Sequence, residues 1–136
     1  MIEAAVVIGH NGHPMYWHCP NESSGYIQDS RKLWEYLWDK RKLIAGIAHT
    51  HPGSGLPGPS RTDLTTFSAI ERALGRRLCW WILSQDRTVL AQHMVLFTTE
   101  DLATRYGCEK EAAYRTIGIP EPFWAAELRE RSEYGR

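Results

Sequence analysis

The hydrophobic positions of this chain change their period several times along the sequence, and the changes predict alternating strands and helices. Residues 3–8 and 43–51 are nearly continuous apolar runs, and the second is typical of a strand covered on both faces. Between residues 29 and 41 leucine and tryptophan recur at helical spacing, which predicts an amphipathic helix that buries both residue types. The same spacing predicts a helix that begins at Ser60 and is capped by Gly75.

Turn residues separate the remaining elements. Asn11-Gly12 predicts a tight hairpin after the first strand. The other expected elements are a returning strand over 15–19, antiparallel strands over 78–83 and 89–97, a short helix and irregular chain over 98–114, and a helix over 120–132. This order predicts a mixed α/β fold in a single domain that covers residues 1–136.

The composition adds little to this picture, but it excludes several classes of protein. The chain carries 16 basic and 16 acidic side chains, so its formal net charge is zero and no nucleic-acid partner is expected. No apolar run is long enough to span a membrane, and the acidic N-terminus is unlike a signal peptide. Three widely spaced cysteines, Cys19, Cys79 and Cys108, predict no disulfide framework and favour a reduced, cytoplasmic setting.

The strongest chemical signal is a pair of histidines at the end of the second apolar run. In a strand, His49 and His51 point to the same face, so their imidazoles can bind one ion. Asp63, in the first turn of the following helix, can supply a third ligand from nearby. Two imidazoles and a carboxylate suit zinc and leave its fourth tetrahedral position open for water, which is typical of a catalytic site.

A second interpretation of the same residues needs no metal. Ser60-x-x-Asp63 matches a capping box, in which each side chain accepts a hydrogen bond from the other residue's backbone N–H. Capping explains the serine and the aspartate, but it requires neither histidine nor the Pro/Gly-rich loop over 52–59. On the residues alone, both interpretations stay open.

The whole string resembles the signature of the JAMM (MPN+ or JAB) zinc metalloproteases: His49-x-His51-Pro52, a short Pro/Gly loop, then Ser60-x-x-Asp63. The resemblance implies the MPN/JAB fold, which is similar to that of cytidine deaminases, with a mixed β-sheet flanked by helices. It implies that His49, His51 and Asp63 hold Zn²⁺ together with a water molecule. It also implies that Ser60 helps to hold the scissile carbonyl oxygen.

The loop departs from the family pattern by one residue. The usual gap between the second histidine and the serine is seven residues, whereas residues 52–59 make eight here. Loops accommodate an extra residue at little cost in free energy. We therefore expect the loop to bulge outward and to leave Ser60 and Asp63 in place.

The resemblance also implies a glutamate on an early strand as the general base. Glu3 fits, because it opens an apolar run that soon reaches Gly9. The structural alternative for Glu3 is a frayed, solvated residue near the chain terminus. Glu22 is the alternative base, since it too precedes the histidine strand, although it lies in a polar loop.

Members of this family hydrolyse peptide or isopeptide bonds at the C-terminus of ubiquitin or ubiquitin-like proteins. The resemblance therefore implies a ubiquitin-like modifier, or its conjugates with an extended Gly-rich tail, as the substrate, and E1- or E2-like proteins as further partners. Two alternatives remain. One is a non-catalytic scaffold of the same fold, although the ligands that such scaffolds typically lack are present. The other is a zinc hydrolase for another small peptide or amide, such as the C-terminus of a carrier protein.

Overall fold

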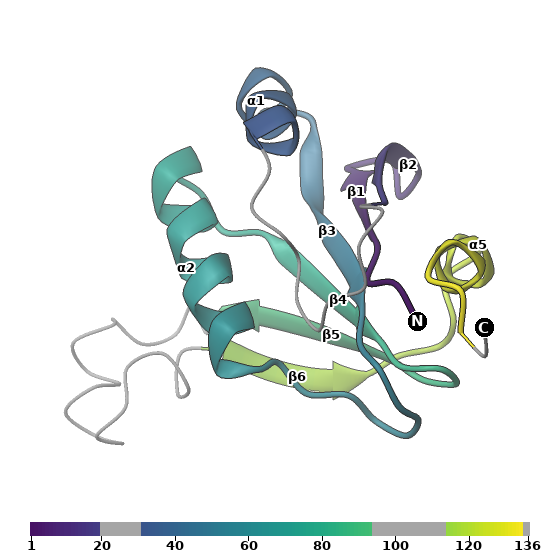
Figure 1. The fold of residues 1–136 in the computed structure, drawn as a ribbon. Helices are drawn as coiled ribbons and strands as arrows, with labels where there is room; N and C mark the ends of the chain where they lie inside the picture. Colours follow the sequence, from purple (N-terminus) through teal and green to yellow (C-terminus); the bar gives the residue numbers. More distant parts are fainter. Residues whose placement is uncertain (20–30, 94–113, 135–136) are drawn as a thin grey trace, which may run out of the picture.

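The computed structural model describes residues 1–19, 31–93 and 114–134, which form a mixed sheet with helices on both faces (Figure 1). The strands are β1 (Ala5–Gly9), β2 (Pro14–His18), β3 (Ile44–Thr50), β4 (Cys79–Leu83), β5 (Thr88–His93) and β6 (Tyr114–Gly118). The helices are α1 (Arg31–Asp39), α2 (Arg61–Leu74) and α5 (Ala125–Arg131). Helices α1 and α2 cover one face of the sheet, and α5 covers part of the other. The predicted mixed α/β fold is confirmed.

The sheet topology brings the carboxyl ends of β3 and β4 together with the loop that follows β3. The strand order is β2-β1-β3-β4-β5-β6, and β3 and β4 are the parallel pair among the described strands. Helix α2 is the crossover between them, as parallel pairing requires. Because β3 and β4 run in the same direction, their carboxyl ends lie side by side, and the loop over 52–59 starts there. His49, near the end of β3, and His51, just after it, therefore lie at this end of the sheet.

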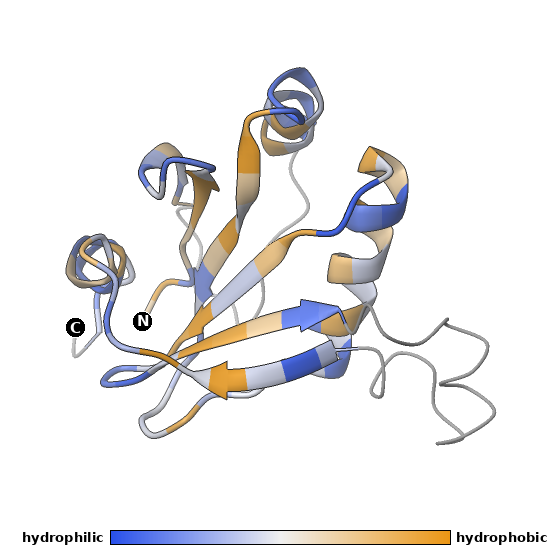
Figure 2. Ribbon diagram, turned by 180° about the vertical axis from the view of Figure 1, so that it is seen from behind, coloured by the Kyte–Doolittle hydropathy of each residue, from blue (hydrophilic) through white to orange (hydrophobic). Residues whose placement is uncertain are grey.

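Two hydrophobic clusters hold the helices against the sheet. On one face, Phe67 of α2 stacks on Trp80 of β4, with ring centroids 4.1 Å apart. On the other face, Trp124 and Leu128 pack against β1, β3 and β4. Figure 2 shows hydrophobic residues along the middle strands, whereas α2 alternates between hydrophobic and hydrophilic residues. Strand β3 is accordingly buried on both faces, as predicted. Within the described ranges, no helix has the length and hydropathy that a membrane span requires.

Several predicted boundaries are confirmed because local chemistry sets them. Gly12 has a positive φ of 83° in the turn between β1 and β2. Ser60 is the N-cap of α2, and Gly75 ends that helix in the left-handed conformation, with φ 71°. The other described strand ends lie within two residues of the predicted positions, and Glu3 precedes β1 rather than opening it. The predicted end of the strand over 89–97 falls outside the described residues.

Other predictions are wrong, each for a physical reason. Strand β6 was not predicted, because it is an edge strand whose residues after Tyr114 are exposed and show no buried alternation. The C-terminal helix covers only Ala125–Arg131, since prolines occupy positions 120 and 122. In α1, Leu33 and Leu37 are buried, but the tryptophans beside them are 37% and 48% exposed, so its buried stripe is narrow. The predictions over 94–113 lie outside the described residues.

Gly46 allows β3 and β4 to approach each other, and we expect Gly46→Ala to destabilise the fold. A Cβ at this position would lie 1.8 Å from the carbonyl oxygen of Cys79, a backbone atom that cannot move aside. The expected loss of unfolding free energy is about 3 kcal/mol or more, measured by thermal or denaturant unfolding. Gly58→Ala is the matched control, because a Cβ there meets nothing within 4 Å. Equal stability of the two variants would contradict the close approach.

Candidate metal centre

The end of β3 places two imidazoles side by side. His49 is fully buried, with its ring against that of Phe67, while the side chain of His51 is 15% exposed. Their Nε2 atoms are 3.0 Å apart. Both face Asp63, whose Oδ2 lies 2.7 Å from Nε2 of His51 and 3.4 Å from Nε2 of His49. The structure thus brings together the three predicted metal ligands.

Asp63 is oriented by the start of helix α2. Its Oδ2 accepts a hydrogen bond from the backbone N–H of Ser60 at 2.9 Å, and its own N–H donates to Oγ of Ser60 at 3.0 Å. The capping box is therefore present, and the same carboxylate oxygen also faces both imidazoles. Capping and ligation are not alternatives here, because the cap holds Oδ2 toward the histidines.

The electrostatics of this cluster favour a cation. Burial by itself would raise the pKa of Asp63, but hydrogen bonds with His49 and His51 outweigh burial and hold that pKa well below its usual range. Burial lowers the pKa of His49. Asp63 is therefore a carboxylate at neutral pH, and the buried imidazole of His49 favours its neutral form, the form that can ligate a metal.

Glu3 is buried beside this cluster. Ala5 pairs with His49, and the backbone N–H of Thr50 donates to the carbonyl of Ala4, so Glu3 lies on the same face as the two histidines. The residue is 1% exposed, and neither carboxyl oxygen has a hydrogen-bond partner among the described residues. Burial raises the pKa of this carboxyl to about 8, and the charge of Asp63 adds to the effect. The solvated alternative for Glu3 is thus wrong, while Glu22 lies outside the described residues.

The donor set fits a metal ion. One ligand atom from each of His49, His51 and Asp63 lies within 4.8 Å of the others. Two ligands of a tetrahedral zinc ion at 2.0–2.1 Å would lie about 3.3 Å apart, close to the spacings found here. The Glu3 carboxyl, which has no partner within the described ranges, also favours a further polar group beside it, because an unpaired buried carboxyl is costly in free energy. This group of residues can hold a metal ion.

A comparison with protein families supports this assignment. A family model described as prokaryotic homologs of the JAB domain matches residues 3–99. The chain belongs to this family. The match spans Glu3, both histidines, Ser60 and Asp63, together with strands β1–β5 and helices α1 and α2. No curated protein matches the chain. The resemblance expected from the His-x-His motif is confirmed for the family and for the fold.

The JAB motif is also supported by residues that the sequence analysis did not identify. Oγ1 of Thr50, the residue between the histidines, accepts a hydrogen bond from the N–H of Ala4 at 3.1 Å and lies 2.7 Å from Oγ of Ser132. The backbone N–H of Ile2 donates to the carbonyl of Ser132 at 2.7 Å. Ser132 thereby joins the strand of His49 to the segment that carries Glu3. A residue 82 positions from Thr50 has no local sequence signal for such a contact.

Proposed function

We propose that this JAB domain is a zinc-dependent peptidase or isopeptidase that hydrolyses the C-terminal amide or isopeptide bond of a ubiquitin-like modifier. The observation that carries the proposal is the convergence of His49, His51 and Asp63 on the face that also holds the buried carboxyl of Glu3, which has no hydrogen-bond partner in the described part of the chain. Three protein ligands leave an open position on zinc, which a structural site would fill with a fourth.

Each of these residues has a distinct role in the proposed reaction. His49, His51 and Asp63 would hold the ion, which when bound polarises a water molecule and the substrate carbonyl. Glu3 accepts the proton of the attacking water and returns it to the leaving amine, either a lysine ε-amine or an α-amine. No covalent intermediate on the protein is needed.

Ser60 would donate a hydrogen bond to the developing oxyanion. Its Oγ accepts from the N–H of Asp63, which uses a lone pair and leaves the hydroxyl proton free to donate. The residue is exposed, so a substrate can reach this hydroxyl while the cap stays formed. One side chain can therefore cap the helix and serve the reaction.

We expect Ser60→Gly to lower kcat by about 10²- to 10³-fold while metal content stays unchanged, because an oxyanion donor is lost. Glycine is a tolerated N-cap, so the helix should lose only a few tenths of a kcal/mol. Ser60→Thr is the matched variant, since it keeps both the cap and the hydroxyl. Steady-state kinetics on both variants make the measurement. Equal rates in the glycine and threonine variants would remove Ser60 from the reaction.

The substrate class follows from the family resemblance. A substrate tail that ends in Gly-Gly would bind in an extended form, and E1- or E2-like proteins would be further partners. The complete ligand set favours an enzyme over a scaffold of the same fold, because a scaffold has no need of His49, His51 and Asp63 together.

The test uses zinc-loaded protein and synthetic peptides. One peptide ends in Gly-Gly joined to a lysine ε-amine, a second carries Gly-Gly in an ordinary peptide bond, and a third carries a bulky residue in place of the final glycine. Mass spectrometry follows cleavage. Cleavage after Gly-Gly, with zinc near one equivalent, supports the proposal. Zinc binding without cleavage of any peptide favours the scaffold, and cleavage that is indifferent to the terminal residue favours a hydrolase of other small amides.

A further inference from the structure

We propose that Tyr134 is a positioning residue for the metal centre and acts through the backbone of His51. The proposal rests on metal binding at His49, His51 and Asp63 as described above. Tyr134 follows helix α5 and lies beyond the residues that the family model matches. It is thus a part of the site that the shared motif does not contain.

The hydroxyl of Tyr134 lies at the point where the parallel strands end. Strand β3 stops at Thr50, so the backbone of His51 is outside the strand that fixes His49. The N–H of His51 donates to the carbonyl of Leu83 at 2.7 Å. The hydroxyl of Tyr134 donates to the carbonyl of His51 and lies 3.2 Å from that of Leu83. Both polar groups of the His51 backbone are therefore held, although the residue lies at a strand end.

The ring of His51 depends on this backbone more than the ring of His49 does. His49 is packed on all sides, whereas the His51 side chain is partly exposed and meets Asp63 through Nε2. Ligand geometry must be held within about 0.5 Å for a site to function well. A backbone that can rotate at His51 would move Nε2 away from the other two ligands, and the Tyr134 hydroxyl opposes that rotation.

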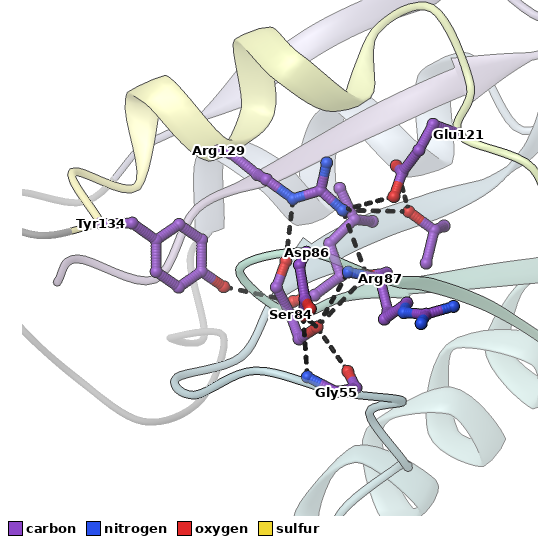
Figure 3. A network of polar contacts seen from close by, with 9 residues as sticks. Gly55, Ser84, Asp86, Arg87, Glu121, Arg129 and Tyr134 are labelled. Carbon is purple, nitrogen blue, oxygen red and sulfur yellow. Dashed lines mark hydrogen bonds and ion pairs between the residues drawn. The ribbon is translucent and has the colours of Figure 1, made fainter.

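The segment that carries Tyr134 is held in place by hydrogen bonds from helix α5. In Figure 3, Arg129 and Tyr134 reach from the C-terminal segment toward the turn that carries Ser84 and Arg87. Nε of Arg129 donates to the carbonyl of Ser84 at 2.8 Å, and the guanidinium also binds Glu121 at 2.9 Å. Glu133 has a left-handed φ of 56°, which turns the chain after α5 immediately before Tyr134. Such a conformation is strained for a residue other than glycine and persists only where surrounding contacts maintain it.

The turn that carries Ser84 also binds the loop over 52–59, which leads to Asp63. Oγ of Ser84 donates to the carbonyl of Gly55 at 2.5 Å, and the N–H of Gly55 donates to Asp86 at 2.8 Å, as Figure 3 shows. The N–H of Gln85 donates to the carbonyl of Gly53 at 2.8 Å. Both glycines have positive φ, which L side chains rarely adopt. Hydrogen bonds thus connect helix α5, the turn at Ser84 and the loop between His51 and Ser60.

The experiment compares Tyr134→Phe with Tyr36→Phe. The hydroxyl of Tyr36 donates to the carbonyl of Met15 at 3.3 Å, so the control also removes a half-buried bond from tyrosine to backbone, but away from the metal ligands. We expect Tyr134→Phe to weaken zinc affinity by about tenfold in a chelator competition, as changes in outer partners of metal ligands do. It should also alter the visible spectrum of the Co²⁺-loaded protein. Tyr36→Phe should do neither.

Wild-type zinc affinity and an unchanged Co²⁺ spectrum in Tyr134→Phe would overturn the inference and leave the proposed function intact. Failure of the unaltered protein to bind zinc would instead overturn the proposed function. Should Tyr134→Phe not fold, Arg129→Lys makes the same test on the helix that leads to Tyr134. Lysine keeps the charge but loses the guanidinium, which bonds to both the carbonyl of Ser84 and the carboxylate of Glu121. Wild-type metal affinity in that variant would count against the inference, and weaker affinity with an altered spectrum would support it.

Discussion

Asp63→Asn is expected to abolish stable zinc binding and, with it, hydrolysis. Asparagine keeps the size of the side chain and an oxygen that can accept from the N–H of Ser60, so the capping box can survive. The variant loses the negative charge that faces both imidazoles. Because outer partners of metal ligands already contribute 10–100-fold to affinity, loss of a ligand should cost at least about 100-fold. Metal analysis after dialysis and a chelator competition measure the effect.

Asp39→Asn is the control for the loss of one negative charge. Asp39 lies at the end of α1 and pairs with Lys40 on the surface, with no contact to the histidines. It should bind one equivalent of zinc, as the unaltered protein does. Full zinc content in Asp63→Asn would mean that the ion is held elsewhere. The convergence of His49, His51 and Asp63 would then be only a hydrogen-bonded helix start.

Glu3→Gln should separate metal binding from catalysis. Glu3 shares a face with the histidines but is not among the three converging ligands, so the variant should retain one equivalent of zinc. Loss of the general base should lower kcat by about 10²- to 10⁴-fold. Zinc content and single-turnover rates on the same preparation make the comparison. An unchanged rate in Glu3→Gln would mean that another acid is the general base, and Glu22→Gln would then be the next test.

The stability of the metal-free protein gives a second check on Glu3. Burial raises the pKa of this carboxyl from 4.5 to about 8, so the folded protein binds its proton more tightly than the unfolded chain does. The stability that this proton supplies is fully present below pH 4.5 and is lost as the pH rises through about 8. Glu3→Gln should therefore melt higher than the unaltered metal-free protein at pH 9 but not at pH 5. A difference that does not change with pH would contradict the raised pKa.

The family match and the geometry of the motif support different parts of the assignment. The match over 3–99 establishes the fold and the family, while the geometry shows that the residues of the motif converge in this chain. The eight-residue loop does not separate them, since Asp63 still lies 2.7 Å from His51. Hydrogen bonds from the turn at Ser84 hold Gly53 and Gly55 of that loop.

Sequence alone determined the parts of this protein that depend on near neighbours. Alternation along the expected strand predicted that His49 and His51 point the same way, and Ser60 begins α2 because its hydroxyl accepts from an N–H three residues away. Only the tertiary structure decided that Glu3 is buried beside the histidines, that the edge strand β6 exists, and that Tyr134 holds His51. These features depend on contacts between residues dozens of positions apart, such as His51 and Tyr134, which are separated by 83. Local periodicity carries no information about such pairs, because the folding of the whole sheet brings them together.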